Sequence, residues 1–154
     1  MLPWLVSGAA GVALGLGAGW LVFAPASGDA DLEVAALIDD YIAAWDAGDG
    51  AAVVSLMTED GVHYSADAQQ GKAANDDGAL GLAALVERIG WATLEPVGDP
   101  IVSEGPPYEA AVIVRLTFPN GQESFEAVDN FFIVEDDDGV LKIAVDSHAF
   151  VGND

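Results

Sequence analysis

The spacing of the apolar residues changes along the chain. In residues 31–47 they recur every three or four positions, which is the spacing of one face of an α-helix. Shorter helical patterns follow in residues 49–56 and 82–90. Apolar residues then alternate with polar ones, the pattern of half-buried strands. The predicted strands are 62–65, 93–102, 109–118, 122–135 and 140–150.

Turn residues separate these elements. Residues 66–78 form a small, polar loop, while 119–121 and 136–139 have the Pro, Asn, Asp and Gly content of tight turns. Pro96 and Pro100 interrupt the strand at 93–102, which favours an edge or bulged position. The order of elements predicts an α+β domain in which three helices pack on one antiparallel sheet.

The chain begins with an uncharged leader. Residues 2–23 carry no charged side chain, and as a helix they would span about 33 Å, enough to cross a bilayer. The small residues Ala24 and Ala26 offer the alternative of a cleaved signal peptide. We therefore expect an anchor or signal at 1–26, a linker at 27–30 and a domain at 31–154. The domain is expected outside the cytoplasm, anchored to the membrane or secreted after cleavage following Ala26.

Charge and composition exclude several functions. The chain has 26 acidic and 4 basic residues, a net charge of −22, and no cysteine. Nucleic acid binding requires a basic surface, and this chain cannot form one. The chain has no cysteine and only two histidines, so it offers no thiolate or multi-histidine metal site. It also has no phosphate-binding glycine loop. We therefore expect neither a metal nor a cofactor. So acidic a surface also predicts a salt-rich habitat.

Asp129 is the most informative acidic residue. On its predicted strand it shares one face with Phe125, Ala127, Phe131 and Ile133. A carboxylate in an apolar strip must find hydrogen-bond donors or remain protonated. Asp129 is therefore either a functional residue in a pocket or a structural hydrogen-bond acceptor.

Other polar residues are placed for a pocket by their spacing. Tyr41 and Trp45 lie on the apolar face of the first helix, as part of the core or as pocket wall. His63 and Ser65 share one face of the first strand, where His63 is a possible acid or base near neutral pH.

The last predicted strand carries a second polar pair. Asp146 and His148 share one face with each other, but strict alternation also places Lys142 on that face. A lysine is a residue of solvated surfaces. We therefore expect Asp146 and His148 on the solvent side.

Three segments of the chain are similar to the nuclear transport factor 2-like superfamily. They are residues 36–49 (ALIDDYIAAWDAGD), 53–62 (VVSLMTEDGV) and 138–143 (DGVLKI). This superfamily includes SnoaL-like polyketide cyclases, ketosteroid isomerase and many binding domains. The resemblance covers residues 31–150. It implies a cone formed by a curved antiparallel sheet wrapped around three helices, a deep apolar pocket, and dimers through the outer face of the sheet.

The ketosteroid isomerase branch implies roles for individual residues. Tyr41 and a protonated Asp129 resemble its oxyanion-binding pair. The general-base aspartate of that branch would fall at about Ser65, and serine cannot take a proton from carbon without a base of its own. Asp67 or His63 would have to supply the base instead.

Two functions remain open at this point. One is a membrane-tethered, homodimeric pocket domain that binds a small apolar ligand or a partner protein without catalysis. The other is an enzyme of SnoaL or ketosteroid isomerase type (an isomerase, cyclase or dehydratase) that stabilises an enolate with Tyr41 and Asp129. The residues expected to contact a ligand are Tyr41, Trp45, Ser65, Phe125 and Phe131.

Overall fold

A computed structural model describes residues 28–65, 71–78, 81–89, 92–118 and 124–151. The expected leader at 1–26, and with it the expected membrane helix, lies outside these ranges. Within them, no helix is both long enough and apolar enough to cross a bilayer.

Three helices form where the apolar spacing predicts them. They are α1 (Asp29–Asp46), α2 (Gly50–Ser55) and α3 (Leu82–Ile89). Gly48 follows α1 with a φ of 67°, a left-handed conformation that glycine adopts without strain. The Asp49 side chain then accepts a hydrogen bond of 2.9 Å from the Ala52 N–H and caps α2. This short connection turns the chain from α1 directly into α2.

Seven strands form one sheet. They are β1 (Met57–Ser65), β2 (Lys72–Ala73), β3 (Thr93–Pro96), β4 (Ile101–Val102), β5 (Tyr108–Thr117), β6 (Ser124–Glu135) and β7 (Leu141–Phe150). Their order is β2-β1-β7-β6-β5-β3, and β4 also pairs with β5. The expectation of a purely antiparallel sheet is wrong, because β1 runs parallel to β7. Since α3 and five further strands separate these two in sequence, the connection is long enough for a parallel pair.

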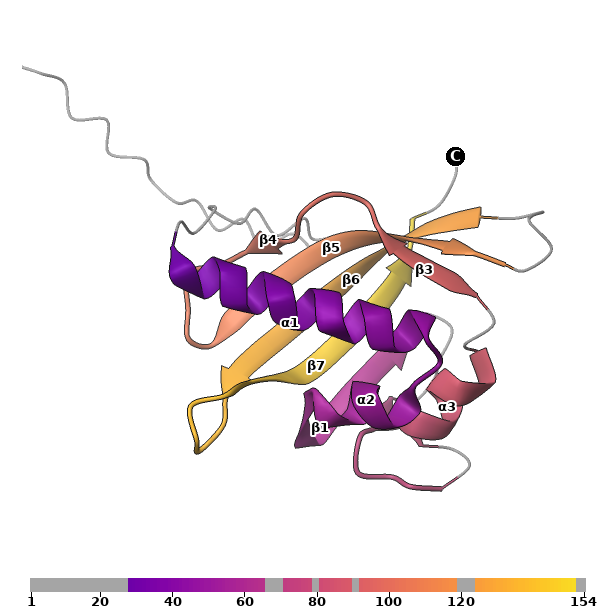
Figure 1. The fold of residues 1–154 in the computed structure, drawn as a ribbon, viewed down its shortest axis with the longest axis horizontal. Coiled ribbons are helices and arrows are strands. Elements are labelled where there is room, and N and C mark those ends of the chain that lie inside the picture. The colour runs from indigo at the N-terminus through magenta and orange to yellow at the C-terminus, as the bar shows by residue number, and fades with distance from the viewer. Residues whose placement is uncertain (1–27, 66–70, 79–80, 90–91, 119–123, 152–154) are drawn as a thin grey trace, which may run out of the picture.

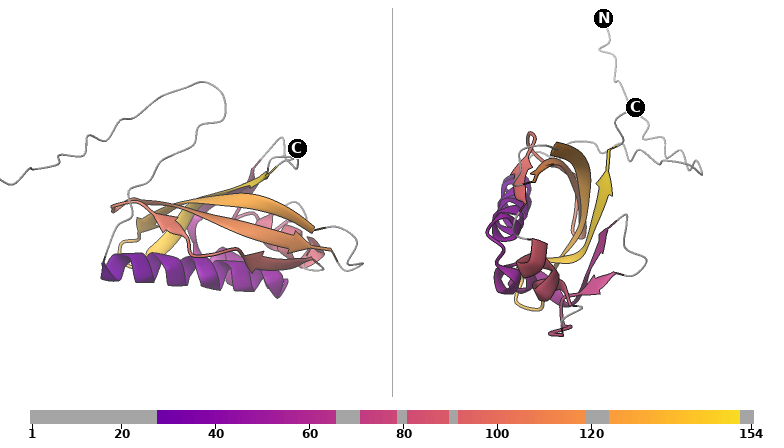
Figure 2. Two further views of the ribbon diagram at one scale, coloured as in Figure 1. Left: turned by 90° about the horizontal axis from the view of Figure 1, so that it is seen from above. Right: turned by 90° about the vertical axis from the view of Figure 1, so that its right-hand side faces the viewer.

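The sheet is curved, and the helices lie on its concave side. Figure 1 shows α1 crossing β5, β6 and β7, with α2 and α3 beside β1. The second view of Figure 2 shows the sheet curving towards the side on which α1 lies. The core lies between α1 and the sheet and includes Val34, Ile38, Val114 and Ile133. The domain is therefore α+β, as the sequence predicts, with a mixed sheet.

A bulge in β7 changes which of its residues face the core. Ile133 of β6 lies opposite Ile143, but the preceding Phe132 lies opposite Val145, so Ala144 is an extra residue in β7. As a result Ile143 and Asp146 are both buried, although three positions separate them. Strict alternation would place these two residues on opposite faces.

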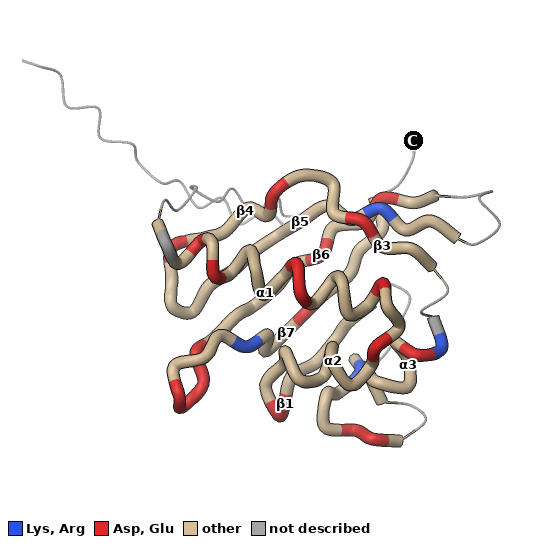
Figure 3. Tube along the Cα trace, in the orientation of Figure 1, with Lys and Arg blue, Asp and Glu red and all other residues tan. Residues whose placement is uncertain are grey.

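Acidic residues occur along the helices and turns, as Figure 3 shows, and most of those described are exposed. Within the described residues, the buried acids are Asp129 and Asp146, which are 4% and 2% exposed. Both lie on the concave face of the sheet.

Candidate functional site

Polar side chains from four neighbouring strands meet on the concave face in two rows. In the first row Asp146 of β7 lies between Phe131 of β6 and His63 of β1, and Lys72 of β2 lies opposite His63. In the second row His148 of β7 lies between Asp129 of β6 and Ser65 of β1. Residues paired across strands project from the same face of a sheet. The pairing therefore brings together residues that are distant in sequence.

Asp146 is the centre of the first row. Its Oδ2 atom accepts a hydrogen bond of 2.9 Å from the Tyr41 hydroxyl and lies 2.6 Å from Nδ1 of His63. Tyr41 and His63 are buried, and the indole ring of Trp45 packs against the His63 ring with centroids 5.1 Å apart. Oδ1 of Asp146 is also buried but has no hydrogen-bond partner among the described residues. The carboxylate thus orients His63 through a single oxygen.

The second row contains a similar pair. Nδ1 of His148 is hydrogen-bonded to Oδ1 of Asp129. The His148 ring packs edge-on against Phe150, with ring centroids 5.1 Å apart. Each histidine of the chain is therefore bonded through Nδ1 to a buried aspartate.

Burial controls the protonation of this group. It raises the pKa of Tyr41 well above its usual value, and the charge of Asp146 raises it further, so Tyr41 stays a hydrogen-bond donor. Burial also raises the pKa of Asp129; the hydrogen bond from His148 opposes this, and the charge of Asp146 reinforces it. The Asp129–His148 pair therefore retains a proton more readily than an exposed carboxylate would.

These hydrogen bonds also determine the role of each imidazole ring. A carboxylate next to Nδ1 favours the tautomer with the proton on that nitrogen. Nε2 of His63 is then the ring nitrogen that can accept a proton. The arrangement is that of a general base oriented by a carboxylate.

A cavity of about 360 Å³ lies against the two rows. Its volume is within the range of sites for small molecules. Most of its surface is apolar, and the charged and polar side chains gather on the wall that the sheet forms. The lining residues are Trp45, His63, Ser65, Lys72, Leu85, Ala92, Leu94, Leu116, Phe118, Asp129, Asp146, His148 and Phe150.

Solved structures share this architecture. No protein-family model matches the chain, and no curated protein matches it either. An uncharacterised protein with a cystatin-like fold from Caulobacter vibrioides superposes with a TM-score of 0.65 at 16% identity, over 81% of this chain and 92% of that one. An NTF2-like protein of unknown function from Pseudomonas putida gives 0.64 at 14% identity, over 80% and 88%. A ketosteroid isomerase-like protein from Erwinia carotovora atroseptica gives 0.60 at 15% identity, over 81% and 98%.

The domain has the nuclear transport factor 2-like (NTF2-like) fold. At such low identities the likeness shows the fold alone. It agrees with the resemblance that residues 36–49 and 53–62 indicate.

The NTF2-like fold places the residues selected from the sequence in different positions around the cavity. Trp45, His63, Ser65 and Asp129 line it. Three others lie behind the lining. Tyr41 and Phe131 pack edge-on with ring centroids 5.7 Å apart, and Phe125 packs against the lining residues Phe118 and Phe150. Asp67 lies outside the described residues.

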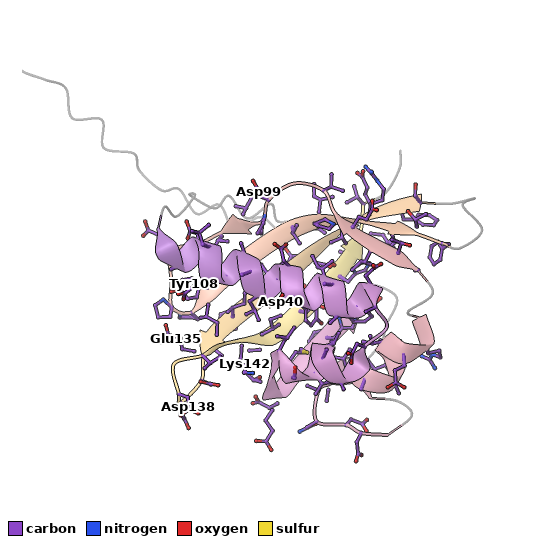
Figure 4. All side chains as sticks on the ribbon, in the orientation of Figure 1. Asp40, Asp99, Tyr108, Glu135, Asp138 and Lys142 are labelled. Carbon is purple, nitrogen blue, oxygen red and sulfur yellow. The ribbon has the colours of Figure 1, made fainter. Side chains whose placement is uncertain are left out.

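One contact and one orientation were not predicted from the sequence. Tyr41 donates a hydrogen bond to Asp146, a contact that no sequence pattern indicates. Asp146 and His148, expected on the solvent side, line the cavity. The bulge at Ala144 separates them from Lys142, which lies near the start of β7 (Figure 4) and donates a hydrogen bond of 2.7 Å to the Ser55 carbonyl. The spacing of Asp146 and His148 is the only sequence signal that links them.

The acidic and histidine side chains of the site form pairs. No group of three or more His, Asp or Glu side chains that could hold a metal ion occurs in the described part of the chain. The Nδ1 atoms of both histidines are bonded to carboxylates.

Proposed function

We propose that the cavity binds a small, largely apolar molecule and that the two His–Asp pairs transfer protons on it. The reaction class is that of an isomerase, cyclase or dehydratase acting by general acid–base catalysis. One observation carries this proposal: both histidines line one apolar cavity, and each has a buried carboxylate at Nδ1. Such orientation is unnecessary for binding an apolar ligand but is required for directed proton transfer.

The two pairs have different roles in this proposal. His63, fixed by Asp146 and Tyr41, accepts a proton from the ligand through Nε2. The Asp129–His148 pair, in which burial raises the pKa of the carboxyl group, holds a proton that it delivers to the ligand. Positioned acids and bases contribute about 10²- to 10⁴-fold each to a rate.

This assignment differs from the ketosteroid isomerase scheme in two ways. Tyr41 already donates its hydroxyl proton to Asp146, so it positions that residue and does not bind an oxyanion. The base is His63 rather than Asp67. Asp129 acts on the ligand together with His148.

Proton transfer can be tested without knowing the natural substrate. The full-length protein is incubated in D₂O with 2-tetralone and related aryl ketones, and loss of the α-proton signal is followed by NMR. We expect faster exchange with at least one ketone. We expect His63→Asn to lower that rate by 100-fold or more, because the asparagine amide replaces Nδ1 as a donor to Asp146 but supplies no Nε2.

Lys142→Met serves as the control, since Lys142 bonds to the Ser55 carbonyl outside the cavity lining. An unchanged exchange rate in His63→Asn would remove His63 as the base. Ligand binding without faster exchange for any ketone would overturn the catalytic proposal.

A non-catalytic pocket domain is the second candidate. The apolar lining favours it, as does the fact that Tyr41, His63 and Asp129 are already bonded within the protein. In that case an apolar ligand or a segment of a partner protein fills the cavity. Its affinity should then be equal in the wild type and in His63→Asn.

The cellular setting remains a separate proposal. We propose that residues 2–23 anchor the chain in a membrane with the domain outside the cytoplasm, and that the chain forms a homodimer. Exposed Ile113 and Phe132 provide apolar surface on the convex face of the sheet for such a contact. Protease accessibility in intact cells and the mass of the detergent-solubilised protein test these two points.

A further inference from the structure

Lys72 is the one basic residue of the chain that lines the cavity. It lies on β2 directly opposite His63. Residues opposite each other in an antiparallel pair have Cβ atoms about 5 Å apart on the same face. Since His63 faces the cavity, Lys72 faces it too.

The other three basic residues are engaged or exposed elsewhere. Arg115 forms an ion pair of 2.8 Å with Glu126, and Lys142 bonds to the Ser55 carbonyl. Arg88 is exposed in the last turn of α3. Lys72 is half-buried, and among the described residues its side chain has neither an ion pair nor a hydrogen bond.

The charge of the protein makes this position unusual. With 26 acidic residues against 4 basic ones, a lysine has many possible partners on the surface. Burying part of a charged side chain without a partner costs free energy. A cation held at a cavity under these conditions is suited to a negative group that arrives with the ligand.

The row Asp146–His63–Lys72 also defines where that group would lie. Neighbouring strands are about 4.8 Å apart, so the backbones of Lys72 and Asp146 are roughly 10 Å apart, with His63 between them. No ion pair joins their two side chains among the described residues. The apolar rings of the lining, such as Phe150, lie further along the strands, beyond His148.

We infer that Lys72 binds the carboxylate of the ligand, so that the substrate of this site is a small apolar carboxylic acid. The ring system of the acid lies against the aromatic lining and its carboxylate lies beside His63. This inference rests on the proposed function, because it assumes that a small molecule occupies the cavity. It adds the chemical class of that molecule and the residue that selects it.

Matched neutral and anionic probes test the inference. Binding of 2-naphthoate and of 2-naphthamide to the full-length protein is measured by calorimetry at the same pH and ionic strength. The two have the same rings, but only the naphthoate carries a charge. We expect the naphthoate to bind at least tenfold more tightly, a difference of about 1.4 kcal/mol. An equal or weaker affinity for the naphthoate would overturn the inference even before any residue is changed.

Variants then locate the effect. We expect Lys72→Met to lose the preference for naphthoate while keeping the affinity for naphthamide, and Lys72→Arg to retain the preference. Lys142→Met removes the same charge away from the cavity and should change neither affinity. A preference that persists in Lys72→Met, or that falls equally in Lys142→Met, would refute the role of Lys72.

Failure of the inference can be distinguished from failure of the proposed function. If naphthamide binds and naphthoate has no advantage, the cavity binds apolar molecules but Lys72 does not select acids. If neither probe binds in the cavity, the proposed function fails and the inference fails with it.

Discussion

Replacing Tyr41 with phenylalanine tests the hydrogen bond that anchors the site. Tyr41 is 1% exposed, and its hydroxyl donates to Oδ2 of Asp146 at 2.9 Å. Phenylalanine keeps the ring that packs against Phe131 and Trp45 and removes only the hydroxyl group. The perturbation is therefore the loss of one buried hydrogen bond with almost no change in packing.

The expected cost follows from the surroundings of Asp146. After the change, Oδ2 keeps only His63 as a partner, while Oδ1 has no partner among the described residues. Hydrogen bonds to charged groups contribute about 1.5–3 kcal/mol, so we expect a loss of about 2 kcal/mol in the free energy of unfolding. With an m-value of about 1.5 kcal/mol per molar urea, the unfolding midpoint should fall by about 1.3 M.

Urea unfolding followed by far-UV circular dichroism measures this shift at constant salt. Tyr108→Phe is the matched control: Tyr108, labelled in Figure 4, is 8% exposed, and its hydroxyl has no hydrogen bond to the described residues. We expect the control to change stability by less than about 0.5 kcal/mol. Equal effects of the two substitutions would refute the reasoning.

A second background checks the same bond. In Asp146→Leu the Tyr41 hydroxyl has lost its acceptor, so Tyr41→Phe should then be neutral or stabilising. An undiminished cost in that background would mean that the hydroxyl acts through another group.

Three further predictions concern burial, packing and charge. Burial raises the pKa of Asp129 in the folded protein above its unfolded-state pKa of about 4. Protonation of Asp129 therefore stabilises the folded protein below pH 4, and this contribution is lost as the pH rises through the folded-state pKa. The advantage of the wild type over Asp129→Asn in unfolding free energy should therefore shrink from pH 4 towards neutrality, and a constant difference would contradict this. Gly50→Ala places a Cβ atom 2.3 Å from the Ala83 carbonyl oxygen, so it should lower the free energy of unfolding by about 1–3 kcal/mol. Gly28→Ala is the control and should have no effect, because the space around Gly28 is open. Raising the salt concentration from 0.1 to 1 M shortens the screening length from about 10 to 3 Å, so the net charge of −22 predicts a higher urea midpoint; an unchanged midpoint would refute the salt-rich habitat.

Local patterns determine the parts of the fold that sequence analysis predicts. Apolar spacing predicts α1 because a helix on a sheet must bury one continuous stripe. It also predicts the burial of Asp129, because β6 alternates without interruption from Ala127 to Ile133. The same alternation places His63 and Ser65 on one face of β1.

Long-range pairing determines the rest. The Tyr41–Asp146 bond joins residues 105 positions apart, and the one between His63 and Asp146 joins residues 83 apart. No local pattern specifies that β1 lies parallel to β7. The inward position of Asp146 further depends on the extra residue Ala144, and alternation counted from Lys142 gives the opposite face. Lys72 belongs to a strand of two residues within a segment predicted to be a loop.

The two histidines of the chain are paired with its buried acids in the described structure. The chain has only two histidines, and within the described residues each is bonded to one of the two buried aspartates. Replacing a buried ionic pair with apolar residues is often neutral or stabilising, so stability alone does not require such pairs. Most of the 26 acidic side chains are available for solubility at the surface. Stability alone therefore does not account for the two Asp–His pairs, and under the proposed function they orient both imidazole rings towards a ligand in the cavity.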